Sequence, residues 1–242
     1  TERLIASARI LGFEIPYTAD EIDAACVQTL AANDQTEAYV RPIAWRGSEQ
    51  LAVSAQQTTI HLAIASWEWP SYFGPERMNG IRLGMAEWKR PSPETAPVAA
   101  KATGLYMIGT LSKHKAEAKG FADALMLDWR GLVAEATGAN IFFVMDGDIH
   151  TPTPDCFLDG ITRRSVMALA KNRQMKVIER PIRPEEMKTA TEAFLAGTAA
   201  EVTPIRNIGE LAFTPGQISE TLLKDYAALV HKSPEDVAKI TG

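Results

Sequence analysis

The spacing of apolar residues along the chain predicts a mixture of helices and strands. Over residues 1–12 apolar side chains recur at helical spacing, at Leu4, Ile5, Ala8 and Leu11. Thr18 opens a capping-box pattern that predicts a second helix through about residue 32. Runs rich in β-branched and aromatic residues at 37–45 and 58–67 predict two strands.

A strand pattern separates two proline-rich stretches, and beyond the second the chain alternates short strand patterns with helical ones. The predicted strands lie at 79–88, 122–128, 140–146, 175–181 and 192–197, and the predicted helices at 103–118, 161–172, 184–189 and 216–231. This order favours an α+β fold over a doubly wound parallel sheet. We expect a small domain over 1–73, a linking loop over 74–80 and a large domain over 81–242.

Composition narrows the class of protein. With 46% hydrophobic and 23% charged residues, the chain resembles an ordinary soluble globular protein. Its net charge of −5 gives no broad electrostatic reason to bind nucleic acid or an anionic membrane, and no apolar run reaches the ~20 residues that span a bilayer. Cys26 and Cys156 are expected to be reduced thiols, which is typical of a cytoplasmic protein.

Several common catalytic motifs are absent. The segment from Gly104 to Gly109 lacks the Lys-Ser/Thr ending of a phosphate loop, and no GxGxxG or GxSxG motif occurs. The four histidines have no metal-ligand spacing, so no metal is expected. His61 alternates with apolar neighbours and is expected to pack in a core or an interface.

Four segments contain candidate chemistry. Lys101 lies among small residues, where burial would favour a nucleophilic amine, although most such lysines are solvated. Glu135 lies among small and apolar residues and needs a partner, which a helix N-cap or a structural ion pair would also supply. The turn at Gly160 opens a helix whose free N–H groups suit phosphate, and the small residues from Gly197 allow a ligand close to the backbone. An amine, a carboxylate and two anion sites are the parts that a pyridoxal-phosphate (PLP) site requires.

The order and the amino-acid sequences of these segments resemble those of the branched-chain amino acid aminotransferases, which belong to the fold-type-IV PLP enzymes. The resemblance extends from residue 1 to about 232 and is densest at 100–106, 134–140, 160–163 and 197–204. It implies a two-domain fold of a small N-terminal α/β domain and a larger β-barrel-like domain. Because the family has further strands upstream and Thr1 begins inside a helical pattern, we expect the small domain to be truncated.

The resemblance assigns cofactor roles residue by residue. Lys101 matches the lysine that bonds to PLP and transfers the proton at the substrate α-carbon. Glu135 matches the carboxylate that keeps the pyridine nitrogen protonated, and Tyr106 matches the tyrosine bonded to the phenolic oxygen. The residues that match phosphate contacts are Arg3, the backbones of Ile161 and Thr162, and Thr198.

Substrate roles follow in the same way. Tyr39 and Arg41 match the strand that faces the substrate carboxylate, and the backbone at Thr198 and Ala199 matches the other half of that site. Trp69 and Tyr72 resemble the aromatic wall of the side-chain pocket, although core packing would also explain them. One departure is Leu105, where relatives often have asparagine.

The reaction implied is transfer of the amino group of a branched-chain L-amino acid to 2-oxoglutarate, in branched-chain amino acid biosynthesis, by a homodimer. Three reactions of the same fold remain alternatives: (R)-selective amine transamination, D-amino acid transamination and aminodeoxychorismate cleavage. A degenerate relative without catalysis is a further alternative. The carboxylate motif at 39–42 argues for an α-amino acid substrate.

Overall fold

The computed structural model describes residues 1–69 and 78–241. The chain divides into two compact units: one comprises the chain up to Pro70 together with Ala99–Ala102, and the other comprises the remainder. The short segment Ala99–Ala102 thus groups with residues far away in sequence. The expected division at 74–80 overlaps residues outside the described ones and stays a prediction.

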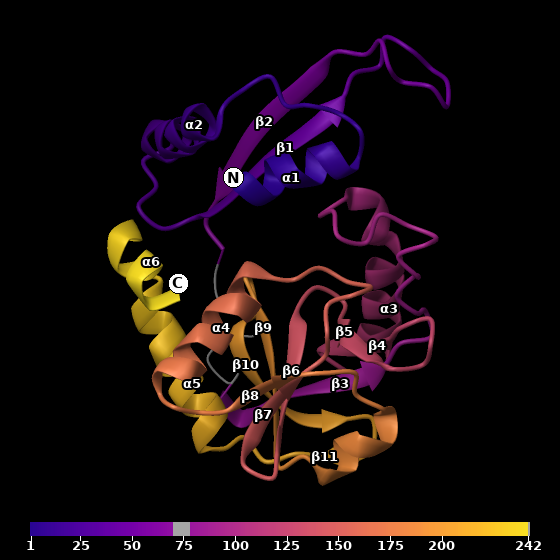
Figure 1. Cartoon of the computed structure of the whole chain (residues 1–242), viewed down its shortest axis with the longest axis vertical. Helices are drawn as coiled ribbons and strands as arrows, with labels where there is room; N and C mark the ends of the chain where they lie inside the picture. The colour runs from indigo at the N-terminus through magenta and orange to yellow at the C-terminus, as the bar shows by residue number, and fades with distance from the viewer. Residues whose placement is uncertain (70–77, 242) are drawn as a thin grey trace. The chain divides into compact units, whose positions relative to one another are not determined.

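The first unit is a two-stranded hairpin covered by two helices (Figure 1). The helices are α1 (Glu2–Ile10) and α2 (Ala19–Ala32), and the antiparallel strands are β1 (Tyr39–Arg46) and β2 (Ile60–Trp67). Even-numbered strand residues face the helices because successive side chains alternate between the two faces of a sheet. This inner face packs into a small core around Ala8, Ile15, Ile22, Ala44 and Leu62.

The second unit is built on a closed barrel of six strands. The strands, in order around the ring, are β3 (Ile81–Met85), β4 (Asp123–Leu127), β5 (Val133–Ala136), β6 (Asn140–Met145), β9 (Glu192–Gly197) and β10 (Glu201–Ile208), which pairs back onto β3. Outside the ring, β7 (Asp148–Thr151) and β8 (Val177–Glu179) extend from β6, and β11 (Leu211–Ala212) extends from β10. One junction is short, since β5 and β6 share the single register pair Glu135 and Asn140.

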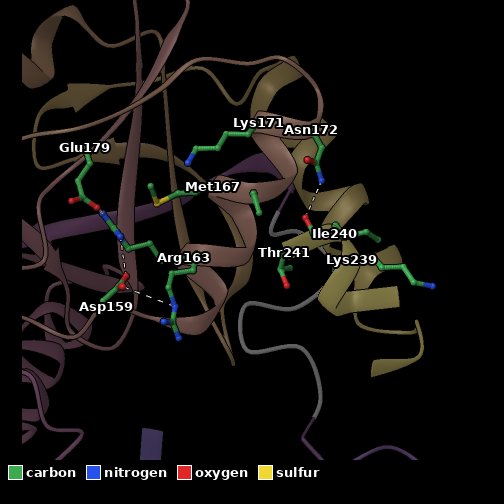
Figure 2. Close-up of a pocket in the computed structure, with 11 residues that line it drawn as sticks. Asp159, Arg163, Met167, Lys171, Asn172, Glu179, Lys239, Ile240 and Thr241 are labelled. Carbon is green, nitrogen blue, oxygen red and sulfur yellow. Dashed lines mark hydrogen bonds and ion pairs between the residues drawn. The ribbon is translucent and has the colours of Figure 1, made fainter. Parts of the chain in front are cut away.

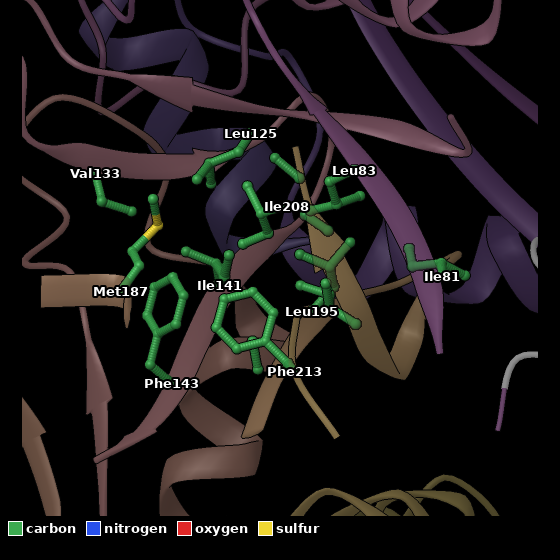
Figure 3. Close-up of a cluster of buried hydrophobic side chains, with 14 of the residues drawn as sticks. Ile81, Leu83, Leu125, Val133, Ile141, Phe143, Met187, Leu195, Ile208 and Phe213 are labelled. Atoms are coloured by element: carbon green, nitrogen blue, oxygen red, sulfur yellow. The ribbon is translucent and has the colours of Figure 1, made fainter. Parts of the chain in front are cut away.

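The barrel strands are apolar on both faces because both faces are buried. Along β6, Ile141 and Phe143 contribute to the cluster shown in Figure 3, which also contains residues of β3, β4, β5, β9 and β10. The intervening Phe142 and Val144 pack outward, against α4 (Ile161–Asn172) and α5 (Gln217–Leu229). An uninterrupted apolar run such as 141–145 therefore fits a strand between two cores.

Three further helical segments connect strands: the 3₁₀ turn η2 (Thr103–Leu105), α3 (Met107–Ala118) and the 3₁₀ helix η3 (Pro184–Thr189). The helix α6 (Pro234–Thr241) follows α5 after the last strand. Buried Glu192 of β9 accepts hydrogen bonds from the backbone N–H groups of Ile218 and Ser219, so a strand carboxylate caps the start of α5. No helix in the described ranges is long and apolar enough to cross a membrane.

The structure confirms the α+β class and the barrel-like large domain. The expected helix over 103–118 is interrupted at Tyr106, between a 3₁₀ turn and α3. Four strands of the described residues were not predicted, β5, β7, β10 and β11, and Glu135 lies within the first of them. His61 does not pack in the core of this unit, because its side chain is 45% exposed and stacks on Trp45 at the hairpin surface; its place in an interface stays a prediction.

Candidate functional site

Glu135 is a buried carboxylate at the junction of β5 and β6. Both it and Arg90 have side chains only 9% exposed, and Nε of Arg90 lies 3.0 Å from Oε1 of Glu135. The N–H direction does not meet hydrogen-bond geometry, so this contact is an ion pair. Arg90 also donates to the carbonyl oxygens of Thr137 at 3.1 Å and Ala136 at 3.4 Å, which ties it to the end of the strand. The structural ion pair foreseen for Glu135 is therefore present.

Asn140 connects Glu135 to the beginning of α4. Its Nδ2 donates to Oε2 of Glu135 at 3.0 Å and to the carbonyl oxygen of Leu158 at 3.1 Å. Gly160 packs directly on this amide, because a Cβ there would collide with Oδ1 of Asn140. The close approach explains why the residue that precedes α4 has no side chain.

The first turn of α4 offers backbone donors beside this carboxylate. Gly160 is the N-cap residue, so the N–H groups of Ile161 and Thr162 lack acceptors within the helix. The Oγ1 of buried Thr162 lies 3.1 Å from the hydroxyl of Tyr226, whose pKa is raised by burial. Thr162 therefore offers its backbone N–H to a ligand, while its hydroxyl already has a partner. Such a helix start favours an anion.

Arg163 fixes the first turn of α4 to neighbouring segments of the chain. Its side chain is 2% exposed and forms ion pairs with Asp159 and Glu179, as Figure 2 shows. It also donates to the carbonyl oxygen of Pro152 at 3.1 Å. These contacts fix the first turn of α4 to β7 and β8, so its N–H groups have a set direction.

The turn between β9 and β10 lies next to the same barrel junction. Strand pairing sets Asn140 opposite Ala196, and a Cβ at Gly197 would lie 3.1 Å from the Cβ of Ala139. Thr198 and Ala199 form the tip of this hairpin, and Thr198 is exposed. The second unit therefore brings together the Glu135 carboxylate, the start of α4 and the small-residue turn.

Tyr106 is connected to the residues around Glu135 through the preceding residue, Leu105. It is the N-cap residue of α3, and 37% of its surface is exposed. The carbonyl oxygen of the preceding Leu105 lies 3.5 Å from a guanidinium nitrogen of Arg90. Arg90 thus connects the segment that carries Tyr106 with the strand that carries Glu135.

The first unit contains the remaining cofactor candidates, Arg3 and Lys101. Arg3 lies on α1 one turn before buried Ser7, whose Oγ accepts a hydrogen bond from the backbone N–H of Lys101 at 3.0 Å. The side chain of Lys101 is exposed, so the small neighbours do not bury it and the solvated alternative fits this structure. What is fixed is the backbone, and Ser7 fixes it.

The substrate candidates Tyr39, Arg41 and Trp69 share the outer face of the hairpin. A guanidinium nitrogen of exposed Arg41 donates to the Tyr39 hydroxyl at 3.2 Å. The rings of Tyr39 and Trp69 have centroids 4.7 Å apart. Tyr72 lies outside the described residues.

Three residues of these arrangements were given no role from the sequence: Ser7, Arg90 and Asn140. Each acts on a candidate residue that is distant along the chain, except Asn140. Asn140 follows Glu135 by five positions across a tight strand connection, so its pairing could have been read from a recognised hairpin.

Two other features lie apart from the candidate residues. Asp128, Asp155 and Cys156 place possible metal-ligand atoms within 4.8 Å of one another. Arg130 already pairs with both carboxylates, at 2.6 and 2.8 Å, and burial raises the pKa of the Cys156 thiol to about 12. This set is therefore an ion-pair cluster of one guanidinium and two carboxylates beside a protonated thiol.

A cavity of about 460 Å³ lies between α4 and α6 (Figure 2). Its lining includes Lys171, Asn172, Lys239 and Ile240, and none of the candidate site residues contributes to it.

Comparisons with known proteins identify relatives of this chain by sequence and by fold. Residues 1–208 match the family model described as amino-transferase class IV. The branched-chain-amino-acid aminotransferase of Pseudomonas aeruginosa is 38% identical over 97% of this chain and 78% of that protein, and that of Escherichia coli is 34% identical over 89% and 71%.

Solved structures of similar proteins extend the match to the fold. The branched-chain aminotransferase of Thermoproteus uzoniensis with norvaline superposes with a TM-score of 0.93 at 36% identity, covering 99% of this chain and 80% of that one. An aminotransferase from Brucella abortus bound to the co-factor PLP gives 0.85 at 31% identity, covering 95% of this chain and 82% of that one. By its sequence, its barrel and these relatives, the chain belongs to the class IV aminotransferase family.

Proposed function

We propose that this protein is a PLP-dependent aminotransferase that transfers the amino group of a branched-chain L-amino acid to 2-oxoglutarate. The observation that carries the proposal is the connection of buried Glu135, through Asn140 and Gly160, to the free N–H groups of α4. A carboxylate that is joined to an anion site through two residues suits a cofactor with a basic ring nitrogen and a phosphate. Relatives at 34–38% identity are branched-chain-amino-acid aminotransferases.

The residues in the second unit fit such a cofactor. Glu135 would hold the ring nitrogen in its protonated form, the N–H groups of Ile161 and Thr162 would hold the phosphate together with Thr198, and Tyr106 would bind the phenolic oxygen. Close packing at Gly160 supports this, because a side chain there would displace Asn140 from the carboxylate. When bound, PLP supplies an electron-accepting ring that acidifies the hydrogen on the substrate α-carbon.

The first unit would supply the amine and a further phosphate contact. We assign to Nζ of Lys101 the covalent attachment of the cofactor and the transfer of the proton at the substrate α-carbon. The backbone N–H of Lys101 donates to Oγ of Ser7 at 3.0 Å, so the backbone position of Lys101 is fixed although its side chain is exposed. Arg3, one turn away on α1, would bind the phosphate.

The substrate carboxylate would bind to Arg41 and the Tyr39 hydroxyl, with the backbone at Thr198 and Ala199 as the other half of that site. Trp69 would form part of the side-chain wall, and Tyr72 belongs to the same proposal although it lies outside the described residues. Arginine binds a carboxylate in a two-pronged geometry, so this assignment requires an amino acid or a 2-oxo acid as substrate.

We further propose a homodimer that works in the cytoplasm on amino acids and 2-oxo acids, without nucleic acid or membrane partners. The net charge of −5 supports the last point. Sedimentation velocity of the purified protein measures its oligomeric state directly.

The deciding experiment is a donor screen on the purified protein reconstituted with PLP. L-leucine with 2-oxoglutarate should yield glutamate and 4-methyl-2-oxopentanoate in equal amounts, and Lys101→Ala should abolish both products and the visible absorption of bound cofactor. The exposed Lys119 supplies the matched control, since Lys119→Ala should leave both unchanged. Turnover of D-alanine or (R)-1-phenylethylamine in place of L-leucine would instead support an alternative reaction of this fold. Absence of any turnover and of bound cofactor would support the degenerate relative.

A further inference from the structure

Arg41 lies in an unusual setting for an exposed arginine. Surface guanidinium groups are usually mobile or paired with a carboxylate. No acidic residue among the described ones forms an ion pair with Arg41, and its hydrogen-bond partner is the Tyr39 hydroxyl. Among the described residues, no carboxylate neutralises the charge of Arg41, and contacts other than an ion pair must fix the position of its guanidinium group.

Two aromatic rings hold the guanidinium in place. Its central carbon lies 4.9 Å from the centroid of Tyr39 and 5.1 Å from that of Trp67, both within cation–π range. Strand pairing explains the geometry, because Trp67 lies opposite Tyr39 and diagonally across from Arg41. The residue directly opposite Arg41 is Ala65, which is too small to compete for the space.

The rings also support one another. Tyr39 and Trp67 have centroids 4.9 Å apart, Trp69 stacks on Trp67 at 5.6 Å, and Trp69 lies 4.7 Å from Tyr39. Three mutually packed rings lose little further freedom when a ligand binds, so a cation held on them is pre-organised.

We propose that Trp67 is a positioning residue that holds Arg41 by cation–π stacking and thereby sets the affinity of the site for the substrate carboxylate. The inference rests on the proposed function in that Arg41 is taken as the carboxylate-binding residue. Trp67 acts through Arg41 and is not assigned a contact with the substrate. Its removal should therefore weaken binding of any carboxylate ligand while the binding of a neutral analogue is unchanged.

The test compares Trp67→Leu, Trp67→Phe and Trp45→Leu in the PLP-loaded protein. Trp45 is the matched control, because it stacks on His61 at the other end of the same face and does not contact Arg41. Calorimetric titration gives the dissociation constant of 4-methylpentanoate, and inhibition kinetics give that of neutral 4-methylpentanamide. We expect Trp67→Leu to weaken 4-methylpentanoate about 3- to 10-fold and to raise the KM for L-leucine by a similar factor, with kcat within about 2-fold.

Trp67→Phe should recover most of the affinity, since a phenyl ring still offers a π face, and Trp45→Leu should match the unaltered protein. Equal loss for the acid and the amide would mean that Trp67 is an apolar wall, and would overturn the proposal. It is also overturned if Trp67→Leu binds the acid normally, or if the unaltered protein binds no 4-methylpentanoate. Protein that binds the acid with these differences but transaminates nothing would support the inference and refute the proposed function.

Discussion

Replacing Arg90 by methionine should destabilise the second unit more than any exposed charge substitution. Arg90 and Glu135 are both 9% exposed, so Arg90→Met leaves a carboxylate in a site with little access to water. The carbonyl oxygens of Ala136 and Thr137 lose a donor in the same step. Methionine preserves much of the side-chain volume, which limits the contribution of an empty cavity.

Breaking a buried ion pair by removing one partner costs about 3–5 kcal/mol. We therefore expect Arg90→Met to lower the free energy of unfolding by about 4 kcal/mol. With a urea m-value of about 2–3 kcal/mol/M, the unfolding midpoint should fall by about 1.3–2 M. The double variant Arg90→Met/Glu135→Leu should recover at least about 2 kcal/mol, because replacing both members of such a pair by apolar groups is often nearly neutral.

Urea unfolding of the cofactor-free protein, followed by circular dichroism, measures these differences without any contribution from a ligand. Lys224 supplies the control, because it pairs with Glu220 one helical turn away on an exposed face. Lys224→Met should change the free energy of unfolding by less than about 0.5 kcal/mol. If Arg90→Met behaves like Lys224→Met, or if Glu135→Leu adds to its effect instead of reducing it, the pair is not what holds Glu135.

Three further predictions concern other residues. Gly160→Ala should push Asn140 away from the carboxylate and weaken PLP at least about 10-fold, measured by fluorescence titration; the loss of the buried hydrogen bond to Glu135 should also lower the free energy of unfolding by about 1–3 kcal/mol. Unchanged affinity would contradict the close packing. Burial raises the pKa of Asp123 above its usual range, so the native state binds the carboxyl proton more tightly than the unfolded state does. The contribution of this group to stability is therefore lost as pH rises through the native pKa. Asp123→Asn should therefore gain stability relative to the unaltered protein between pH 4 and pH 8 in thermal melts, and parallel curves would refute this. Burial also raises the pKa of the Cys156 thiol to about 12, so iodoacetamide at pH 8 should label Cys26 first by mass spectrometry; equal rates would show that Cys156 is accessible.

Local pattern was sufficient for much of the fold. The hairpin strands and α2 were predicted to within about two residues, because alternation and the Thr18 capping box are local signals. β10 was missed because Pro204 lies inside it, and proline rarely occurs between two paired strands. β5 was missed because Glu135 interrupts its apolar pattern.

Family resemblance supplied the candidate residues, which stay predictions, but it gave no indication of the contacts that support them. Arg90 reaches Glu135 across an intervening helix and strand, and no periodicity marks such a pair. Ser7 and Lys101 are likewise joined across 94 positions. Lys101 shows the limit of local reasoning, because its small neighbours left burial and solvation both open, and the side chain is exposed.

The short junction between β5 and β6 makes one seam of the barrel weaker than the rest. A single register pair closes it, Glu135 with Asn140, whereas β6 and β9 share five. Opening of the ring should begin there, and amide hydrogen exchange in β5 should precede exchange in β9. A ligand that binds Glu135 would stabilise this junction, so its occupancy would appear as slowed exchange along β5.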